Sequence, residues 1–211
     1  MLWLALVAAM VALGYGARAS SGKPDDQVLY QWSTFVGTLI QDGIVLAIVL
    51  AIAGWRPDLF ALRKPAGGLW RTLGTIGTAL VVVYAFEIAY TALAHPGNEQ
   101  GLTPDKWEPQ HAVVYVANAA AICLWVPFVE EMTFRGLGYT LLEPYGQWAA
   151  ILLVGLFFGL AHGLIVSLPV IVAFGCVLAW IRSRLDSVVP GMVLHGAFNL
   201  VALVAAVTVQ R

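Results

Sequence analysis

Long apolar runs, separated by short polar breaks, are the feature of this sequence that most restricts its fold. Each run is close to the length of about 20 residues that a helix needs to cross a bilayer. The runs occupy residues 2–16, 33–54, 73–94, 112–143, 148–165, 166–183 and 188–208. None of them has the period-two alternation of a membrane β-barrel strand. The pattern therefore predicts an all-α fold, a polytopic bundle of transmembrane helices with about seven crossings, within a range of about six to eight.

The composition favours the same fold. Of the 211 residues, 60% are hydrophobic and 11% are charged, whereas a soluble domain carries about 25% charged residues. A water-soluble globule of this size cannot hide so much apolar surface, so we expect the lipid bilayer as a partner. The net charge of −1 gives no indication of nucleic-acid binding. We expect a single membrane domain over residues 1–211, in a multi-pass protein of the plasma membrane.

Basic residues orient the expected helices. Arg56, Arg63, Lys64 and Arg71 lie between the second and third runs, and positively charged loops stay on the cytoplasmic side of a membrane. The segment 17–19 resembles a cleavage site, so the first run has a signal peptide as its alternative interpretation. Because this run lacks a positively charged start, we expect a retained helix. The fourth run is too long for one straight crossing, and either a kink at a proline or an end outside the hydrocarbon explains its length.

Three runs contain polar side chains at positions where a membrane helix is normally apolar. They are Glu130, Glu131 and Arg135 in the fourth run, His162 in the fifth, and His195 and Asn199 in the seventh. An ionisable group within a crossing costs several kcal/mol and indicates a functional site by default. Counted from the expected cytoplasmic ends, Glu130, Asn199 and the two histidines lie at depths of about 12 to 21 Å. We therefore expect these four side chains to meet in one polar site.

Spacing along the fourth run separates the two glutamates. Glu131 and Arg135 are four residues apart, so they share a helix face and are expected to form an ion pair. Glu130 points about 100° away from its neighbour. One carboxylate is thus neutralised while the other stays free for chemistry.

The free carboxylate and the other polar groups suggest a hydrolytic reaction. Glu130 beside His162 is expected to deprotonate a water molecule for attack on an amide carbonyl. His195 and Asn199, which are also four residues apart, offer two hydrogen-bond donors to the resulting oxyanion. The hypothesis is direct peptide hydrolysis without a covalent enzyme intermediate.

We expect no cofactor for this reaction, with zinc as the alternative. Glu130, His162 and His195 together supply two imidazoles and one carboxylate, a ligand set that binds catalytic zinc. The H-E-x-x-H motif of a zinc-protease helix is absent from the sequence. Neither Ser33 nor Ser167 has a histidine and an aspartate spaced to suggest a catalytic triad.

Taken together, the three motifs resemble those of a known family. E-E-x-x-F-R-G at 130–136, F-x-x-x-H at 158–162 and H-x-x-x-N at 195–199 are similar to the motifs of the CAAX protease and bacteriocin-processing family. These are intramembrane glutamate endopeptidases that include the type II CAAX prenyl endopeptidases. The resemblance covers about residues 120–205, which we take as the catalytic core.

The resemblance implies an activity and a set of roles. It implies hydrolysis of a peptide bond near the C-terminus of a membrane-associated substrate, or the processing of a peptide, so the partner would be a peptide or a lipidated protein. It implies that Glu130 and His162 activate water and that the third motif, with His195 and Asn199, stabilises the oxyanion. It leaves supporting structural or electrostatic roles to the other glutamate and the arginine of the first motif.

Two other functions stay open at this point. One is a non-catalytic membrane scaffold or bacteriocin-immunity-type factor with the same fold, and the other is a proton-coupled carrier that uses the acids and histidines as a relay. Asp42 and Glu87 also lie in apolar runs, outside the motifs, and we interpret both as structural. Six glycines are expected at close contacts between helices: Gly136, Gly138, Gly155, Gly159, Gly163 and Gly196.

Overall fold

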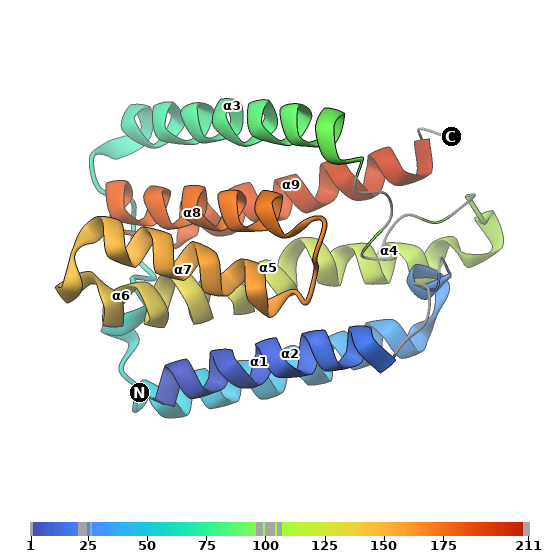
Figure 1. Ribbon diagram of the computed structural model, residues 1–211, viewed down its shortest axis with the longest axis horizontal. Coiled ribbons are helices and arrows are strands. Elements are labelled where there is room, and N and C mark those ends of the chain that lie inside the picture. Colours follow the sequence, from blue (N-terminus) through green and yellow to red (C-terminus); the bar gives the residue numbers. More distant parts are fainter. Residues whose placement is uncertain are drawn as a thin grey trace.

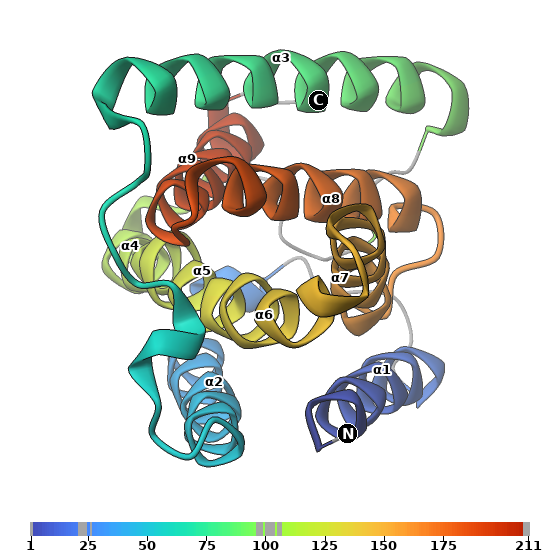
Figure 2. The same cartoon turned by 90° about the vertical axis from the view of Figure 1, so that its left-hand side faces the viewer.

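The protein is seen here in a computed structural model that describes residues 2–20, 25, 27–95, 99, 104 and 107–208. These residues form helices and no strand, which confirms the expected all-α bundle. Six of the described helices are long and apolar enough to cross a membrane: α1 (Leu2–Ser20), α2 (Trp32–Ile52), α3 (Gly68–Ala94), the continuous helix Pro109–Tyr145, α8 (Leu168–Leu185) and α9 (Val189–Thr208). A seventh apolar helix, α7 (Gln147–Ala161), is shorter. Figure 1 shows these helices packed in one bundle, and Figure 2 shows that α3 and α8 cross the direction of α2 and of α4 (Ala112–Ala120).

The helix boundaries differ from the apolar runs by a few residues. The third helix begins at Gly68, whereas its apolar run begins near residue 73. The helix of the fifth run ends at Ala161, whereas the run continues to about residue 165. Gly163 adopts a positive φ of 64°, a left-handed conformation that ends a helix and that glycine adopts without strain. The residues after it form the turn that leads into α8. Short 3₁₀ segments lie at Val28–Tyr30, Pro57–Phe60, Pro109–His111 and Glu143–Tyr145.

The long fourth helix changes register along its length. It consists of α4 (Ala112–Ala120), the π-helical segment η4 (Ala121–Trp125), α5 (Val126–Glu130), a second π-helical segment η5 (Glu131–Gly138) and α6 (Tyr139–Leu142). π-Helical segments are uncommon and are frequently found at functional sites. Pro127 is the second residue of α5, just after the first of them. The length of the fourth run is thus taken up by one continuous helix with two widened segments.

The helices are arranged in three groups around a central core. Figure 2 shows α3 along one side of the bundle and α1 and α2 along the opposite side, with the helices from α4 to α9 between them. Glycines permit the closest contacts, as predicted: a Cβ at Gly155 would lie 2.7 Å from the backbone nitrogen of Cys176, and one at Gly196 would lie 2.3 Å from the carbonyl oxygen of Cys123. Both cysteines are free and partly buried.

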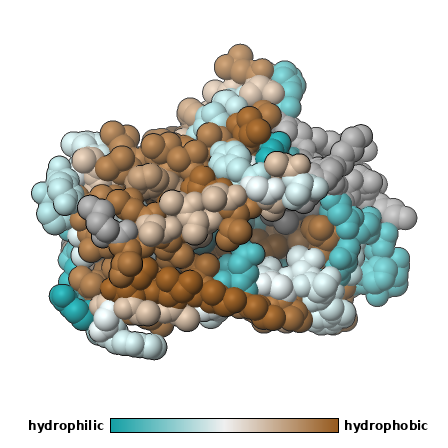
Figure 3. All heavy atoms as spheres, turned by 60° about the horizontal axis from the view of Figure 1, so that its bottom comes forward, coloured by the Kyte–Doolittle hydropathy of each residue, from teal (hydrophilic) through white to brown (hydrophobic). Residues whose placement is uncertain are grey.

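The outer surface suits a lipid environment. Figure 3 shows that apolar side chains cover much of the side of the bundle, while hydrophilic side chains gather toward its ends. Large exposed apolar residues include Ile44 on α2, Val81 and Leu93 on α3, and Val113 on α4. A soluble protein does not expose so much contiguous apolar area. The protein is therefore an integral multi-pass membrane protein.

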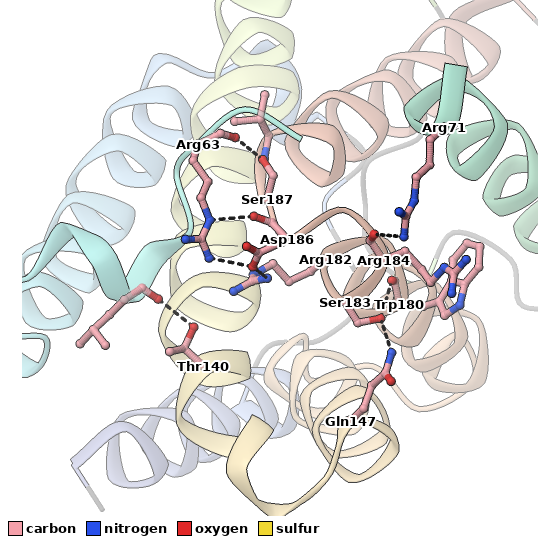
Figure 4. A network of polar contacts seen from close by, with 12 residues as sticks. Arg63, Arg71, Thr140, Gln147, Trp180, Arg182, Ser183, Arg184, Asp186 and Ser187 are labelled. Atoms are coloured by element: carbon pink, nitrogen blue, oxygen red, sulfur yellow. Dashed lines mark hydrogen bonds and ion pairs between the residues drawn. The ribbon is translucent and has the colours of Figure 1, made fainter. Parts of the chain in front are cut away.

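A polar network holds one end of the bundle together (Figure 4). Arg63, in the loop before α3, donates to Asp186 Oδ1 over 2.7 Å and to the Asp186 carbonyl over 2.9 Å. Arg182 donates to the same carboxylate oxygen over 2.8 Å, and Ser187 donates to the carbonyl of Arg63. Arg71 reaches the carbonyl of Arg184 over 3.0 Å. This network fixes the α8–α9 turn against the basic loop, and so sets the position of α9.

Candidate active site

A cavity of about 440 Å³ lies within the bundle, with walls from α2, α3, the η4–α5 segment, α7, α8 and α9. All four residues predicted to perform chemistry line it: Glu130, His162, His195 and Asn199. They come from three separate helical regions. The expectation that they meet in one place is therefore matched by their positions in the structure.

The carboxylate of Glu130 lies between two imidazole rings. Its Oε1 is 3.7 Å from Nε2 of His162, and its Oε2 is 3.6 Å from Nε2 of His195. Both distances exceed the 2.7–3.2 Å of a direct hydrogen bond. The Glu130 side chain keeps 19% of its surface exposed and that of His162 keeps 21%, so a small molecule in the cavity can reach both.

The orientation of His162 follows from its backbone partner. His162 is the C-cap of α7, and its Nδ1 lies 2.7 Å from the carbonyl oxygen of Phe158. A carbonyl oxygen only accepts, so Nδ1 carries the proton that it donates. In the neutral ring, Nε2 is then an acceptor, and it faces Glu130.

His195 is oriented by the other glutamate. Its Nδ1 lies 3.3 Å from Oε1 of Glu131, and its ring is 5% exposed. Because the carboxylate accepts, Nδ1 is the donor in this contact. His195 Nε2 can therefore donate into the cavity only when the ring carries both protons.

Glu131 and Arg135 form the predicted ion pair in the core. Arg135 Nη1 is 3.0 Å from Glu131 Oε1, and both side chains are fully buried. The guanidinium also lies over the ring of Phe158, 4.1 Å from its centroid, and donates to the carbonyl of Gly175 over 3.1 Å. Glu131 approaches α9 at Gly191. A Cβ at this position would lie 2.8 Å from Glu131 Oε2, so a glycine allows the close approach. The pair thus joins the first motif to α8 and α9.

Asn199 has a backbone partner across the cavity wall. Its side-chain nitrogen donates to the carbonyl of Ile122 in η4 over 2.9 Å. An amide NH₂ group has two donors, so the second N–H of Asn199 remains for a ligand. His195 and Asn199 are one helical turn apart on α9, and both line the cavity.

The geometry of the described residues also bears on metal binding. Among the parts of the chain that the structure describes, no group of three or more His, Cys, Asp or Glu side chains is arranged to hold a metal ion. Glu130, His162 and His195 come together, and Nε2 of each histidine faces an oxygen of the Glu130 carboxylate.

Three acidic residues near the site were not assigned to it from the sequence. Glu87 of α3 and Glu99, which follows α3, line the same cavity. Glu99 accepts hydrogen bonds from the backbone nitrogens of Ile165 and Ser167, over 2.9 and 2.7 Å. Asp42 does not line the cavity, and its Oδ2 is buried without a hydrogen-bond partner among the described residues. None of the three belongs to a motif, so only the arrangement of the helices identifies their positions.

Comparison with protein families adds to this geometry. Residues 112–201 match a family model described as type II CAAX prenyl endopeptidase Rce1-like. The chain carries an Rce1-like segment. The match confirms the resemblance inferred from the three motifs, and it runs from α4 into α9. The comparisons with curated proteins and with solved structures gave no match.

The Rce1-like segment contains the whole of the predicted polar site. All six motif residues lie within it, whereas α1, α2 and α3 precede it. Glu87 and Glu99 also precede it, although they line the same cavity. The matched family is one of endopeptidases. The chain is thus a multi-pass membrane protein in which residues 112–201 resemble a peptidase family.

Proposed function

We propose that the protein is an intramembrane endopeptidase of the CAAX type, which hydrolyses a peptide bond of a membrane-associated peptide or lipidated protein in the plasma membrane. The observation that carries this proposal is the position of the Glu130 carboxylate, 3.7 Å from Nε2 of His162 and 3.6 Å from Nε2 of His195 at the wall of a cavity. The Rce1-like match over these residues supports it.

The separation of Glu130 and His162 suits the activation of water. Both Glu130 Oε1 and His162 Nε2 are acceptors, because the Nδ1 proton of His162 is engaged by Phe158. A water molecule placed between them donates one hydrogen to each, and a pair of acceptors in this position withdraws a proton as the oxygen attacks. Glu130 takes the proton, and the water oxygen bonds to the carbonyl carbon of the substrate.

The tetrahedral intermediate needs donors for its oxyanion. The second N–H of Asn199 is one donor at the cavity, and Nε2 of His195 is another when the ring carries both protons. Preorganised donors of this kind are among the largest contributions to catalysis. Glu131 and Arg135 hold the His195 ring in place. The C–N bond then breaks, Glu130 passes its proton to the leaving amine, and the products are a carboxylic acid and an amine.

This route uses no cofactor. Its test against the zinc alternative is the activity of the purified full chain in liposomes after treatment with a chelator. We expect full turnover after chelation. Loss of turnover that one added metal restores would favour Glu130, His162 and His195 as zinc ligands.

The main test compares membrane peptides and protein termini from cells that contain the wild-type chain, Glu130→Gln or His162→Ala. We expect a set of cleavage products that is present with the wild type and reduced by a factor of at least about 100 with either variant. Glu143→Gln is the matched control, because this exposed carboxylate lies outside the cavity. Thermal unfolding in detergent shows that each variant is folded. Full turnover by Glu130→Gln would contradict the proposal, and an unchanged biological effect would favour a scaffold.

A further inference from the structure

The active-site cavity extends well beyond the catalytic residues. From Glu130 it continues past α8 and α9 to α3, where Glu87 and Thr91 line its wall. Its volume of about 440 Å³ falls in the range of ligand pockets, about 300–1,000 Å³. The cavity therefore has room for side chains of a substrate on the α3 side of the cleaved bond.

The wall between these two ends is aromatic. Tyr84 of α3 packs on Phe198, with ring centroids 5.9 Å apart, and Phe198 stacks on Phe174 at 4.5 Å. Phe174 in turn contacts the ring of His195 at 5.2 Å. Apolar and aromatic surfaces of this kind accommodate the carbon stem of a long side chain, and the faces of aromatic rings attract cations.

The ionisable groups that line the cavity do not all have a partner. Its ionisable lining residues are three glutamates and two histidines, with no lysine or arginine among the described residues. Glu99 is paired with Arg18 at 2.8 Å and accepts backbone hydrogen bonds. Glu130 faces the two imidazoles.

Glu87 is the exception among these carboxylates. No residue in the described part of the chain makes a hydrogen bond or an ion pair with it. It lies inside a membrane-crossing helix, seven residues before the end of α3 at Ala94. An unpaired carboxylate at such a position costs several kcal/mol, and such groups pair with an opposite charge or face a water-filled cavity. Glu87 lines the cavity, so a cation that enters the cavity can pair with its carboxylate.

We propose that Glu87 is a specificity-determining residue that binds a lysine or arginine side chain of the substrate close to the cleaved bond. The apolar stem of such a side chain packs along Phe174 and Phe198, and its cationic head meets the Glu87 carboxylate and the Thr91 hydroxyl. This inference rests on the proposed function and adds the substrate class for the same cavity.

The test uses synthetic peptides and the full chain in detergent micelles. The peptides differ at one position near the cleaved bond, which carries lysine, arginine, glutamate or norleucine, the last a neutral analogue of lysine. We expect the wild type to cleave the lysine and arginine peptides with kcat/KM at least about tenfold above the norleucine peptide. Glu87→Gln removes this preference and keeps cleavage of the norleucine peptide. Glu87→Asp restores part of the preference, which a purely structural role of the carboxylate would not require.

Two further measurements separate this inference from the proposed function. Glu143→Gln is the matched loss of a carboxylate outside the cavity and is expected to keep the preference. Binding of the fluorescent lysine and norleucine peptides to Glu130→Gln, followed by anisotropy, reports the preference without cleavage. Cleavage that depends on Glu130 but is equal for lysine and norleucine overturns this inference alone. Absence of any Glu130-dependent cleavage contradicts the proposed function, and equal binding of the two peptides then overturns the role of Glu87 as well.

Discussion

The side-chain amide of Asn199 donates to the carbonyl oxygen of Ile122 over 2.9 Å. Ile122 lies in the π-helical segment η4, where an N–H group bonds to the carbonyl five residues before it, as Val126 does to Ala121. The residue that would bond to Ile122 in this register is Pro127, which has no N–H. The proline therefore leaves a carbonyl free, and an asparagine from α9 satisfies it. This contact fixes the direction of the second N–H of Asn199, the one assigned to the oxyanion.

The first prediction concerns this coupling. Asn199→Ala leaves the Ile122 carbonyl without its donor and is expected to lower the free energy of unfolding by about 1–2 kcal/mol. Pro127→Ala restores a backbone N–H that can bond to this carbonyl, so the same loss of Asn199 is expected to cost less in that background. A double-mutant cycle measured by thermal unfolding in detergent gives the difference. Equal costs in the two backgrounds would show that the proline and the asparagine act independently.

Much of this site could be predicted from the sequence because depth in a membrane follows from simple counting. The rise per residue placed Glu130, His162 and His195 at similar depths, and in the structure Nε2 of each histidine lies within 3.7 Å of a Glu130 carboxylate oxygen. The pairing of Glu131 with Arg135 followed from their four-residue spacing, and it is present.

Other parts of the site could not be predicted, since counting gives a depth but no direction around the bundle. Whether Glu87 faces lipid or the cavity depends on how α3 is rotated against α8 and α9, and no motif fixes that rotation. The bond from Asn199 to Ile122 depends on a π-helical register that arises from packing as well as from Pro127. Glu99 lies far from α8 in sequence, so only its contacts in the structure show that it binds the start of that helix.

The second prediction concerns the buried ion pair. Glu131→Ala leaves Arg135 charged and without its partner in a fully buried site, which is expected to cost about 3–5 kcal/mol of stability. The double variant Glu131→Gln with Arg135→Met removes both charges and is expected to recover most of this loss. Cleavage is expected to stay low in the double variant, because His195 has lost the carboxylate that orients its ring. Thermal unfolding and turnover, measured on the same preparations, separate the two effects. Full activity in the double variant would exclude a positioning role for Glu131.

The third prediction tests the closeness of α9 to the fourth helix. A Cβ at Gly196 would lie 2.3 Å from the carbonyl oxygen of Cys123, which is backbone and cannot rotate away. Gly196→Ala is therefore expected to displace α9, to lower the thermal midpoint and to reduce cleavage, since His195 and Asn199 are on the same helix. Gly77→Ala is the matched control, because a Cβ there meets nothing within 4 Å and helix propensity favours alanine by about 1 kcal/mol. A Gly196→Ala protein as stable and active as the control would show that the two helices can separate at no cost.

The last prediction concerns the pH dependence of stability through Glu99. Burial raises the pKa of this carboxyl, but the N–H groups of Ile165, Ser167 and Val166 outweigh burial and hold its pKa below the ordinary value of 4.5. Because the folded pKa is the lower one, the ionised carboxylate contributes its full stability above about 4.5 and loses it as the pH falls through the folded pKa. Glu99→Gln lacks this contribution. Thermal midpoints measured from pH 7 downward are expected to show the largest gap between wild type and variant at neutral pH, and a shrinking gap below about 4.5. A gap that stays constant over this range would mean that the carboxylate is not the group that holds the α7–α8 turn.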